Sequence, residues 1–237
     1  MIDIHTHIIP DVDDGSESYE ETYDMIKTAI QVGFTDIITT SHYINEYYTS
    51  IAEEREEVLK NIKQYIIENE LKMNVYNGSE IYVSFDMVEL LKNNIVSSLA
   101  GSKYVLFELP MNSRLLYLEY CIHELKANGY IPIVAHPERY KYVQEKPEIL
   151  KEWREKGVKF QSNYLSLIGY YGKEAEKTLK KLLKLDLIDF LGTDAHSAIH
   201  YEKIPECIKV LKTCVTAEKF EQLTTTNALK IIKNELE

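Results

Sequence analysis

The first fifteen residues, MIDIHTHIIPDVDDG (1–15), contain the pattern that decides the fold. His5 and His7 stand two positions apart in an apolar run, and a cluster of aspartates follows them. In an extended strand, residues i and i+2 point to the same face, so both imidazoles would be aimed at one point. The pattern therefore predicts a strand that supplies half of a metal site.

Apolar runs of this kind recur along the chain with helical patterns between them. They are spaced by about 30 residues, which is the length of a strand-plus-helix unit. Gly33 and Gly129 end two of the helical patterns, as glycines do at helix C-caps. The predicted strands are MIDIH (1–5), TDIITTSH (35–42), MNVYNGSEI (73–81), KYVLFEL (103–109), YIPIVAH (130–136), VKFQSN (158–163) and LIDFLGTD (187–194), and the predicted helices are 18–32, 50–70, 85–93, 114–128, 147–156, 173–184 and 203–213.

This alternation of strands and helices predicts an α/β fold. Strands joined through helices imply a parallel sheet, and seven evenly spaced units favour closure into a barrel over an open sheet. No linker rich in proline or glycine divides the chain, so residues 1–237 are expected to form a single domain.

Charge and cysteine content narrow the class of protein. The chain has 27 basic and 38 acidic residues and a formal charge of −11, which argues against a nucleic-acid partner bound through a basic surface. Its three cysteines form no C-x-x-C pair, which indicates a reducing compartment rather than a disulfide framework. No signal peptide is recognisable, and no apolar stretch approaches the ~20 residues of a membrane span. We expect a cytoplasmic protein without membrane insertion.

Potential metal ligands fall at the ends of the predicted strands. In a parallel barrel the C-terminal ends of all strands open on one face, which is where such folds carry their chemistry. Each ligand taken singly has an ordinary structural explanation as a buried histidine, an ion-pair partner or a helix cap, but the repetition at so many strand ends predicts a metal cluster. The residues are His42, Glu80, Glu108, His136, Asp194 and His196, which join His5 and His7.

Two choices stay open at this point. The pattern does not choose among Asp11, Asp13 and Asp14 as the ligand that follows the first strand. His123 lies inside a predicted helix, and His200 follows the last ligand pair at a distance that does not require proximity, so neither is included.

The donor set indicates the metal and the chemistry. Imidazole and carboxylate without thiolate suit Mn, Fe or Zn, and the abundance of carboxylates favours Mn or Fe. About nine candidate ligands exceed the needs of one ion, so two or three divalent ions are expected. Such clusters lower the pKa of bound water to ~7 and hold both oxygens of an in-line displacement, which suits phosphoester hydrolysis.

Arg139 in the segment HPERY (136–140) is the candidate phosphate-binding residue. It stands three residues beyond His136, where a guanidinium would take two phosphate oxygens in a fork. The alternative is a salt bridge at the rim with Glu138 or Glu145.

These residues resemble those of the PHP (polymerase and histidinol phosphatase) superfamily, and more closely the bacterial capsule and exopolysaccharide tyrosine phosphatases of the CpsB/YwqE type. The resemblance implies a distorted (β/α)7 barrel with its active site at the C-terminal strand ends. It runs nearly end to end and is carried by MIDIHTHIIPDVDDG, ITTSHY, YNGSEIY, LFELP, GYIPIVAHPERY and GTDAH.

The resemblance also implies a trinuclear site with Asp14 as the aspartate ligand. A metal-bridging hydroxide would attack the phosphorus while Arg139 binds the phosphoryl oxygens. One metal would be held by His5, His7, Glu80 and Asp194, a second by Glu80, Glu108 and His136, and a third by Asp14, His42 and His196, with Glu80 as the bridge.

One departure from the family pattern concerns phosphate binding. Similar proteins carry another arginine shortly after the DxH motif, whereas this chain reads DAHSAIHYEKIP. Tyr201 or Lys203 is expected near that place.

The implied substrate is a tyrosine-rich C-terminal cluster on a membrane-associated tyrosine autokinase that controls polysaccharide export and chain length. Two tyrosine pairs, Tyr47-Tyr48 and Tyr170-Tyr171, fall in loops near the expected active face, where they would contact a peptide.

Other functions fit these residues less well. A cysteine-dependent phosphatase needs an arginine six positions after its cysteine, and Ala127, Thr213 and Phe220 occupy those positions here. The main alternative is histidinol-phosphate phosphatase, which would share the barrel and most ligands; HPERY and LFELP favour the tyrosine phosphatases. A second alternative is a regulator that binds phosphotyrosine without turnover.

Overall fold

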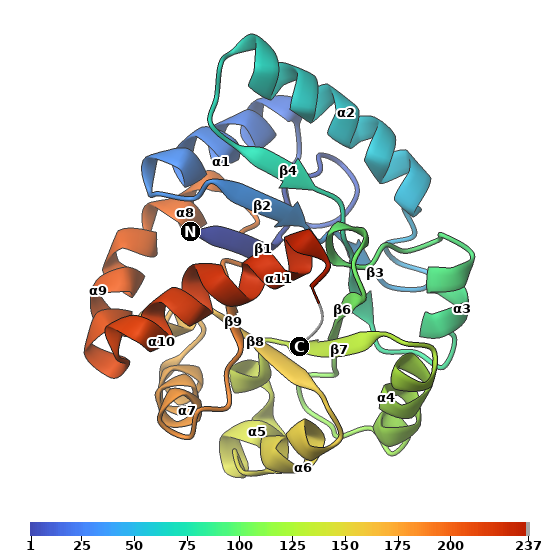
Figure 1. The fold of residues 1–237 in the computed structure, drawn as a ribbon, viewed down its shortest axis with the longest axis vertical. Coiled ribbons are helices and arrows are strands. Elements are labelled where there is room, and N and C mark those ends of the chain that lie inside the picture. Colours follow the sequence, from blue (N-terminus) through green and yellow to red (C-terminus); the bar gives the residue numbers. More distant parts are fainter. Residues whose placement is uncertain (236–237) are drawn as a thin grey trace.

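A computed structural model describes residues 1–235, and its strands are parallel throughout, as predicted (Figure 1). One sheet has the order β1-β2-β4 and the other the order β3-β5-β6-β7-β8-β9. The strands are β1 (Ile2–Thr6), β2 (Asp36–Thr39), β3 (His42–Tyr43), β4 (Asn74–Tyr76), β5 (Glu80–Tyr82), β6 (Tyr104–Glu108), β7 (Ile131–Ala135), β8 (Lys159–Asn163) and β9 (Phe190–Gly192).

The two sheets curl so that β1 lies beside β9. The backbone N–H of Asp194 donates to the carbonyl of His5 at 2.7 Å, and Thr6 forms a parallel bridge with Ala195. Gly192 permits this approach, because a Cβ at that position would stand 2.7 Å from the Cβ of His5. The first and last strands of the predicted barrel are therefore neighbours.

Two predicted strands are each broken in the middle. The run 35–42 becomes β2 and β3, and the run 73–81 becomes β4 and β5. The break lets β2 pair with β1 and β4, while β3 pairs with β5. Its consequence is functional, since His42 and Glu80 become direct partners across the β3–β5 register.

Helices cover the outside of the strands (Figure 1). The predicted helix 114–128 begins only at Leu118, and the four short helices at 141–145, 198–202, 217–221 and 227–233 were not predicted. The first helix has Ser18 as its N-cap, whose side chain accepts from the N–H of Glu21. The helices are α1 (Tyr19–Gln31), α2 (Ala52–Glu68), α3 (Met87–Lys92), α4 (Leu118–Ala127), α5 (Lys141–Glu145), α6 (Ile149–Glu155), α7 (Lys173–Lys184), α8 (Ala198–Glu202), α9 (Ile204–Cys214), α10 (Ala217–Glu221) and α11 (Asn227–Lys233).

Short turns complete the chain. They are 3-10 helices at Leu99–Gly101, Pro137–Arg139 and Tyr164–Ile168 and a π-helical turn at Gln222–Thr226. None of the helices within residues 1–235 combines the length and the apolar character needed to cross a bilayer.

The hydrophobic core consists of two apolar clusters, and neither covers the C-terminal ends of the strands. A large cluster lies between strands and outer helices, and a smaller one joins Ile4, Leu106 and Ile133 of the strands to Ala228 and Ile231 of α11. Helix α11 lies across the strands in Figure 1. This apolar cluster includes residues near the strand starts, such as Ile2 and Phe190, so polar side chains are left at the opposite ends.

Candidate active site

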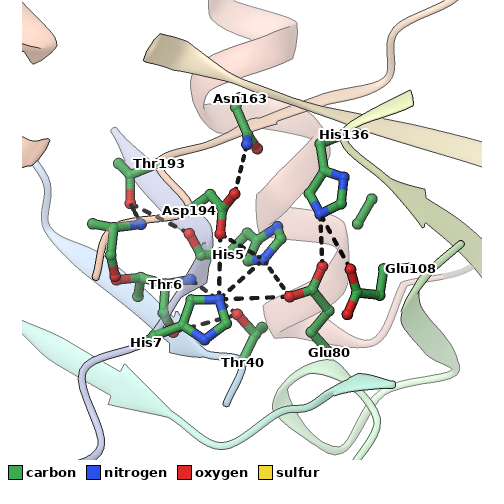
Figure 2. A network of polar contacts seen from close by, with 12 residues as sticks. His5, Thr6, His7, Thr40, Glu80, Glu108, His136, Asn163, Thr193 and Asp194 are labelled. Atoms are coloured by element: carbon green, nitrogen blue, oxygen red, sulfur yellow. Dashed lines mark hydrogen bonds and ion pairs between the residues drawn. The ribbon is translucent and has the colours of Figure 1, made fainter. Parts of the chain in front are cut away.

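The predicted ligands meet at the C-terminal ends of the strands, and Figure 2 shows the deeper part of the cluster. Eight of the nine fall into three overlapping groups, each with its ligand atoms within 4.8 Å of one another, and the ninth, His136, contacts Glu80 from outside these groups. The groups are His5, His7, Glu80 and Asp194; His42, Glu80 and Glu108; and His7, Asp14, His42 and His196.

The deepest group is built on β1. The Nε2 atoms of His5 and His7 lie 3.4 Å apart, as the alternation of an extended segment predicts. The Nε2 of His5 is 3.1 Å from Glu80 Oε2 and 3.4 Å from Asp194 Oδ1. All four side chains are buried, with at most 2 % of each residue exposed.

Glu80 lies at the centre of the cluster. Its Oε1 is 2.9 Å from Nε2 of His136, and its Oε2 is 3.1 Å from Nδ1 of His42. Glu108 approaches the same two nitrogen atoms, at 3.4 Å from His42 Nδ1 and 4.0 Å from His136 Nε2. A carboxylate that faces several imidazoles has the position required of a bridging ligand.

The structure separates the three aspartates that the pattern left open. Asp14 Oδ1 lies 3.6 Å from His42 Nε2 and 3.5 Å from His196 Nε2, on the more exposed side of the cluster. Asp13 instead accepts the backbone N–H of His42 at 2.8 Å and contacts His7 Nδ1 at 2.8 Å. Asp11 is exposed. Asp14 is therefore the aspartate whose carboxylate faces the outer imidazoles.

Supporting partners hold the histidines in one tautomer, and the sequence did not reveal them. Gln161 Oε1 is 2.8 Å from His5 Nδ1, and Asp13 Oδ2 is 2.8 Å from His7 Nδ1. Because an amide or carboxylate oxygen only accepts, Nδ1 carries the proton and the Nε2 lone pair points into the cluster. Asn163 similarly donates to Asp194 Oδ2 at 2.7 Å. Gln161 and Asn163 alternate on β8, which was the one signal available.

Two of the clustered residues have left-handed backbone conformations. His136, directly after β7, has a φ of 33°, and Asp194, two residues after the end of β9, has a φ of 52°. Non-glycine residues rarely adopt this region, and they persist there when surrounding contacts hold them. The strand ends are thus bent so that both side chains join the cluster.

The charges of the cluster fit divalent cations. The cluster opens into a hollow, and Arg139 is the single arginine or lysine among the described residues that line it. Burial, together with Glu80 and Asp194, raises the pKa of Glu108 well above its usual range. The Glu80 Oε2 and His42 Nδ1 atoms are buried and lie 3.1 Å apart, yet neither makes a hydrogen bond. Buried acceptor atoms that make no hydrogen bond, in a set of imidazoles and carboxylates, are suited to Mn, Fe or Zn.

Arg139 stands at the edge of this cluster. Its Nη1 donates to Asp194 Oδ2 at 2.9 Å, and its guanidinium lies 4.4 Å from the ring centroid of Tyr171. Glu138, the alternative partner, is buried and accepts from the backbone N–H of Asn163 instead. Arg139 therefore faces a hollow of about 350 Å³ that is also lined by Asp14, His42, Glu108, Met111, His136, Tyr170, Tyr171, Asp194, His196 and His200.

The remaining candidates divide between this hollow and other places. His200 lines the hollow although the sequence did not include it, whereas His123 is exposed on α4. Tyr201 is wholly buried and donates to Asp3 at 2.8 Å, so its hydroxyl is engaged in the core. Lys203 lies with its Nζ 6.0 Å from the ring of Tyr170.

The first tyrosine pair is less close to the hollow than the second. Tyr47 is 80 % exposed, and the ring of Tyr48 stacks 5.8 Å from the imidazole of His42. Tyr170 and Tyr171 both line the hollow.

Comparison with solved structures shows what this arrangement resembles. The chain superposes with a TM-score of 0.93 and 31% identity on a structure described among "YwqE from Bacillus subtilis and CpsB from Streptococcus pneumoniae, unique metal-dependent tyrosine phosphatases", covering 100% of this chain and 96% of that one. A histidinol phosphate phosphatase from Lactococcus lactis has a TM-score of 0.56 and 18% identity, over 88% of this chain and 92% of that one. The second likeness shows the fold alone.

Comparison with known sequences agrees. The tyrosine-protein phosphatase YwqE of Bacillus subtilis is 33% identical over 83% of this chain and 78% of its own length. The tyrosine-protein phosphatase CpsB of Streptococcus agalactiae is 29% identical over 99% of both chains. The family model for capsular polysaccharide synthesis, CpsB/CapC, matches residues 1–233. With that match spanning nearly the whole chain, the protein belongs to the CpsB/CapC family.

Proposed function

We propose that this chain is a metal-dependent protein-tyrosine phosphatase that acts in capsular or exopolysaccharide synthesis. The observation that carries the proposal is the convergence of the histidine and carboxylate groups around Glu80, with Arg139 at their edge. The relatives named tyrosine-protein phosphatase match most of this chain. Histidinol-phosphate phosphatase is not favoured, since that likeness extends only to the fold.

The proposed ions are two or three, with manganese preferred over iron or zinc for this carboxylate-rich set. When bound, they would activate water near neutral pH and neutralise phosphoryl charge. Their ligands would be His5, His7, Glu80 and Asp194 for one ion, Glu80, Glu108 and His136 for a second, and Asp14, His42 and His196 for a third. His42 also groups with Glu80 and Glu108, so it is within reach of the second ion.

Arg139 would bind and orient the phosphoryl group. Asp194 and the Tyr171 ring hold its guanidinium at the edge of the hollow, and the N–H groups not used by Asp194 are donors for phosphoryl oxygens. A phenolate is a good leaving group compared with an alkoxide, so no strong general acid is required. Of the described cysteines, Cys121 and Cys207 are buried, which fits a mechanism without a cysteine nucleophile.

A second hollow supports a protein substrate over a small ester. It has a volume of about 450 Å³ and adjoins the first, because Met111, Arg139 and Tyr171 line both. Lys141 and Lys173 also line it. A polypeptide that presents its phosphotyrosine at Arg139 would have room to continue there. We further propose that this substrate is a membrane-associated tyrosine autokinase and that the chain works in the cytoplasm, as its free cysteines suggest.

Phosphate release tests the proposal. We would compare a phosphotyrosine peptide, a phosphoserine peptide and histidinol phosphate, using protein reconstituted with manganese and protein stripped by a chelator. We expect selective hydrolysis of the phosphotyrosine peptide that is lost on stripping and regained with metal. Preference for histidinol phosphate would indicate a histidinol-phosphate phosphatase. Metal-loaded protein that hydrolyses none of the three substrates would indicate a regulator that binds phosphotyrosine without turnover.

A further inference from the structure

Tyr170 is a side chain at the catalytic hollow that belongs to none of the ligand groups. It lies in the segment between β8 and α7 and lines the same hollow as Arg139 and Asp194. The residue is 48 % exposed. Its backbone N–H donates to the carbonyl of Leu165 at 3.2 Å, which ties the loop to the preceding 3-10 turn.

His200 fixes the direction of the Tyr170 hydroxyl. The backbone N–H of His196 donates to Nδ1 of His200 at 3.0 Å, so Nδ1 is an acceptor. The other ring nitrogen, Nε2, then carries the proton. It lies 3.0 Å from the hydroxyl oxygen of Tyr170 and donates to it. The hydroxyl hydrogen of Tyr170 is therefore left to donate elsewhere.

Neighbouring side chains restrict the ring of Tyr170 as well. Tyr171 meets it at an interplanar angle of 85° with the centroids 5.1 Å apart, and the ring of His200 lies 5.3 Å away at 76°. The guanidinium of Arg139 lies over the ring of Tyr171. The half-exposed Tyr170 is thus held by its neighbours in the hollow that the proposed phosphate-binding arginine also lines.

We propose that the Tyr170 hydroxyl donates a hydrogen bond to the phosphoryl group of the substrate, together with Arg139, and that His200 is the positioning residue that orients this hydroxyl. The inference rests on the proposed function and deepens it. Arg139 follows β7 and Tyr170 follows β8, so the phosphoryl group would be held by donors from two adjacent loops. No proton is transferred, because the hydroxyl acts only as a donor.

The first test is Tyr170→Phe, which removes the hydroxyl and keeps the ring. We expect kcat/KM for a phosphotyrosine peptide to fall by about 10- to 100-fold, the usual effect of losing a hydrogen bond to a charged group. The inhibition constant for inorganic phosphate should rise by a similar factor, because phosphate binds more weakly. Tyr120→Phe is the matched control, since Tyr120 is 50 % exposed on α4 and does not line the hollow. Equal metal content in all variants is checked by elemental analysis.

The second test separates positioning from structure. His200→Asn keeps an oxygen that accepts the N–H of His196 but loses the donor to Tyr170, whereas the longer amide of His200→Gln can restore that donor. We expect His200→Asn to lower kcat/KM about 3- to 10-fold, with partial rescue in His200→Gln, and to have no further effect in the Tyr170→Phe background.

Specific outcomes would overturn the inference. The inference is wrong if Tyr170→Phe stays within about twofold of the native protein in both kcat/KM and the inhibition constant for phosphate. A loss with the peptide but unchanged phosphate inhibition is another, because the hydroxyl would then contact the peptide rather than the phosphoryl group. Failure of the proposed function is seen separately, as absence of phosphotyrosine turnover by the native protein.

Discussion

The inner and outer parts of the site are built in different ways. His5, His7, Glu80 and Asp194 are at most 2 % exposed, and all of them but Glu80 are held by a hydrogen bond to a residue outside the ligand groups. The outer part is more open: the side chain of Asp14 is 53 % exposed, and those of Arg139 and His196 are 27 % and 25 % exposed. The difference teaches that strand ends fix the buried part of the metal-binding geometry, while loops leave the outer ligands and the phosphate-binding arginine accessible.

The largest expected effect comes from the centre of the inner part. Glu80→Gln keeps the shape but removes the negative charge that faces His5, His42 and His136. Metal content should fall, and phosphotyrosine turnover should drop by more than about 1000-fold, beyond the loss of one transition-state donor. Glu56→Gln on α2 is a control outside the site. Full activity and metal content in Glu80→Gln would contradict the bridging role.

The outer part should show a smaller loss of a different kind. Arg139→Lys keeps the charge but loses the planar fork, so kcat/KM should fall by about 100-fold while metal content is unchanged. The chain offers a matched control in Arg154→Lys, since Arg154 also pairs with a carboxylate, Asp189, and lies over an aromatic ring, that of Phe160. If Arg139→Lys instead lost its metal, the division between the two parts would be wrong.

Loss of a supporting contact should change metal affinity more than turnover. Gln161→Leu removes the acceptor that holds the His5 Nδ1 proton, and metal affinity should weaken by about 10-fold or more. Titration with manganese measures this, and activity should recover at high metal concentration. Gln64→Leu on the exposed side of α2 should leave the titration unchanged. Equal affinity for Gln161→Leu would mean that the barrel alone orients His5.

The sequence predicted those features that depend on strand ends. Alternation in a strand places His5 and His7 on one face, and the parallel barrel brings His42, Glu80 and His136 to the same end, so their proximity follows from local patterns. Contacts between distant segments carry no such signal. Gln161 reaches His5 across 156 positions, and the preference for Asp14 over Asp13 depends on where His42 and His196 come to lie.

The breaks in two strands escaped prediction for a related reason. The apolar run 35–42 has no glycine or proline to mark the break between β2 and β3. The run 73–81 does contain Asn77-Gly78, a turn signal, at the break between β4 and β5. A Cβ at Gly78 would stand 2.8 Å from the carbonyl oxygen of Thr39, so the break depends on a neighbouring strand. His200 was missed likewise, because its contacts with His196 and Tyr170 appear only when α8 is placed beside the hollow.

The smallest expected effect concerns the cysteines, which belong to neither part of the site. Burial raises the pKa of Cys121 to about 11 and that of Cys207 to about 12. Because the thiolate is the reactive form, about 0.1% of Cys121 or less is reactive at pH 8, and alkylation there should be slow. The more exposed Cys214 would be labelled first, without touching the cluster. Iodoacetamide at pH 8 should therefore leave phosphotyrosine turnover unchanged, with Cys214→Ser as the control for labelling. Rapid inactivation that inorganic phosphate prevents would place a thiol at the reacting phosphorus, and a metal cluster with a phosphate-binding arginine at its edge would then fail as an account of catalysis.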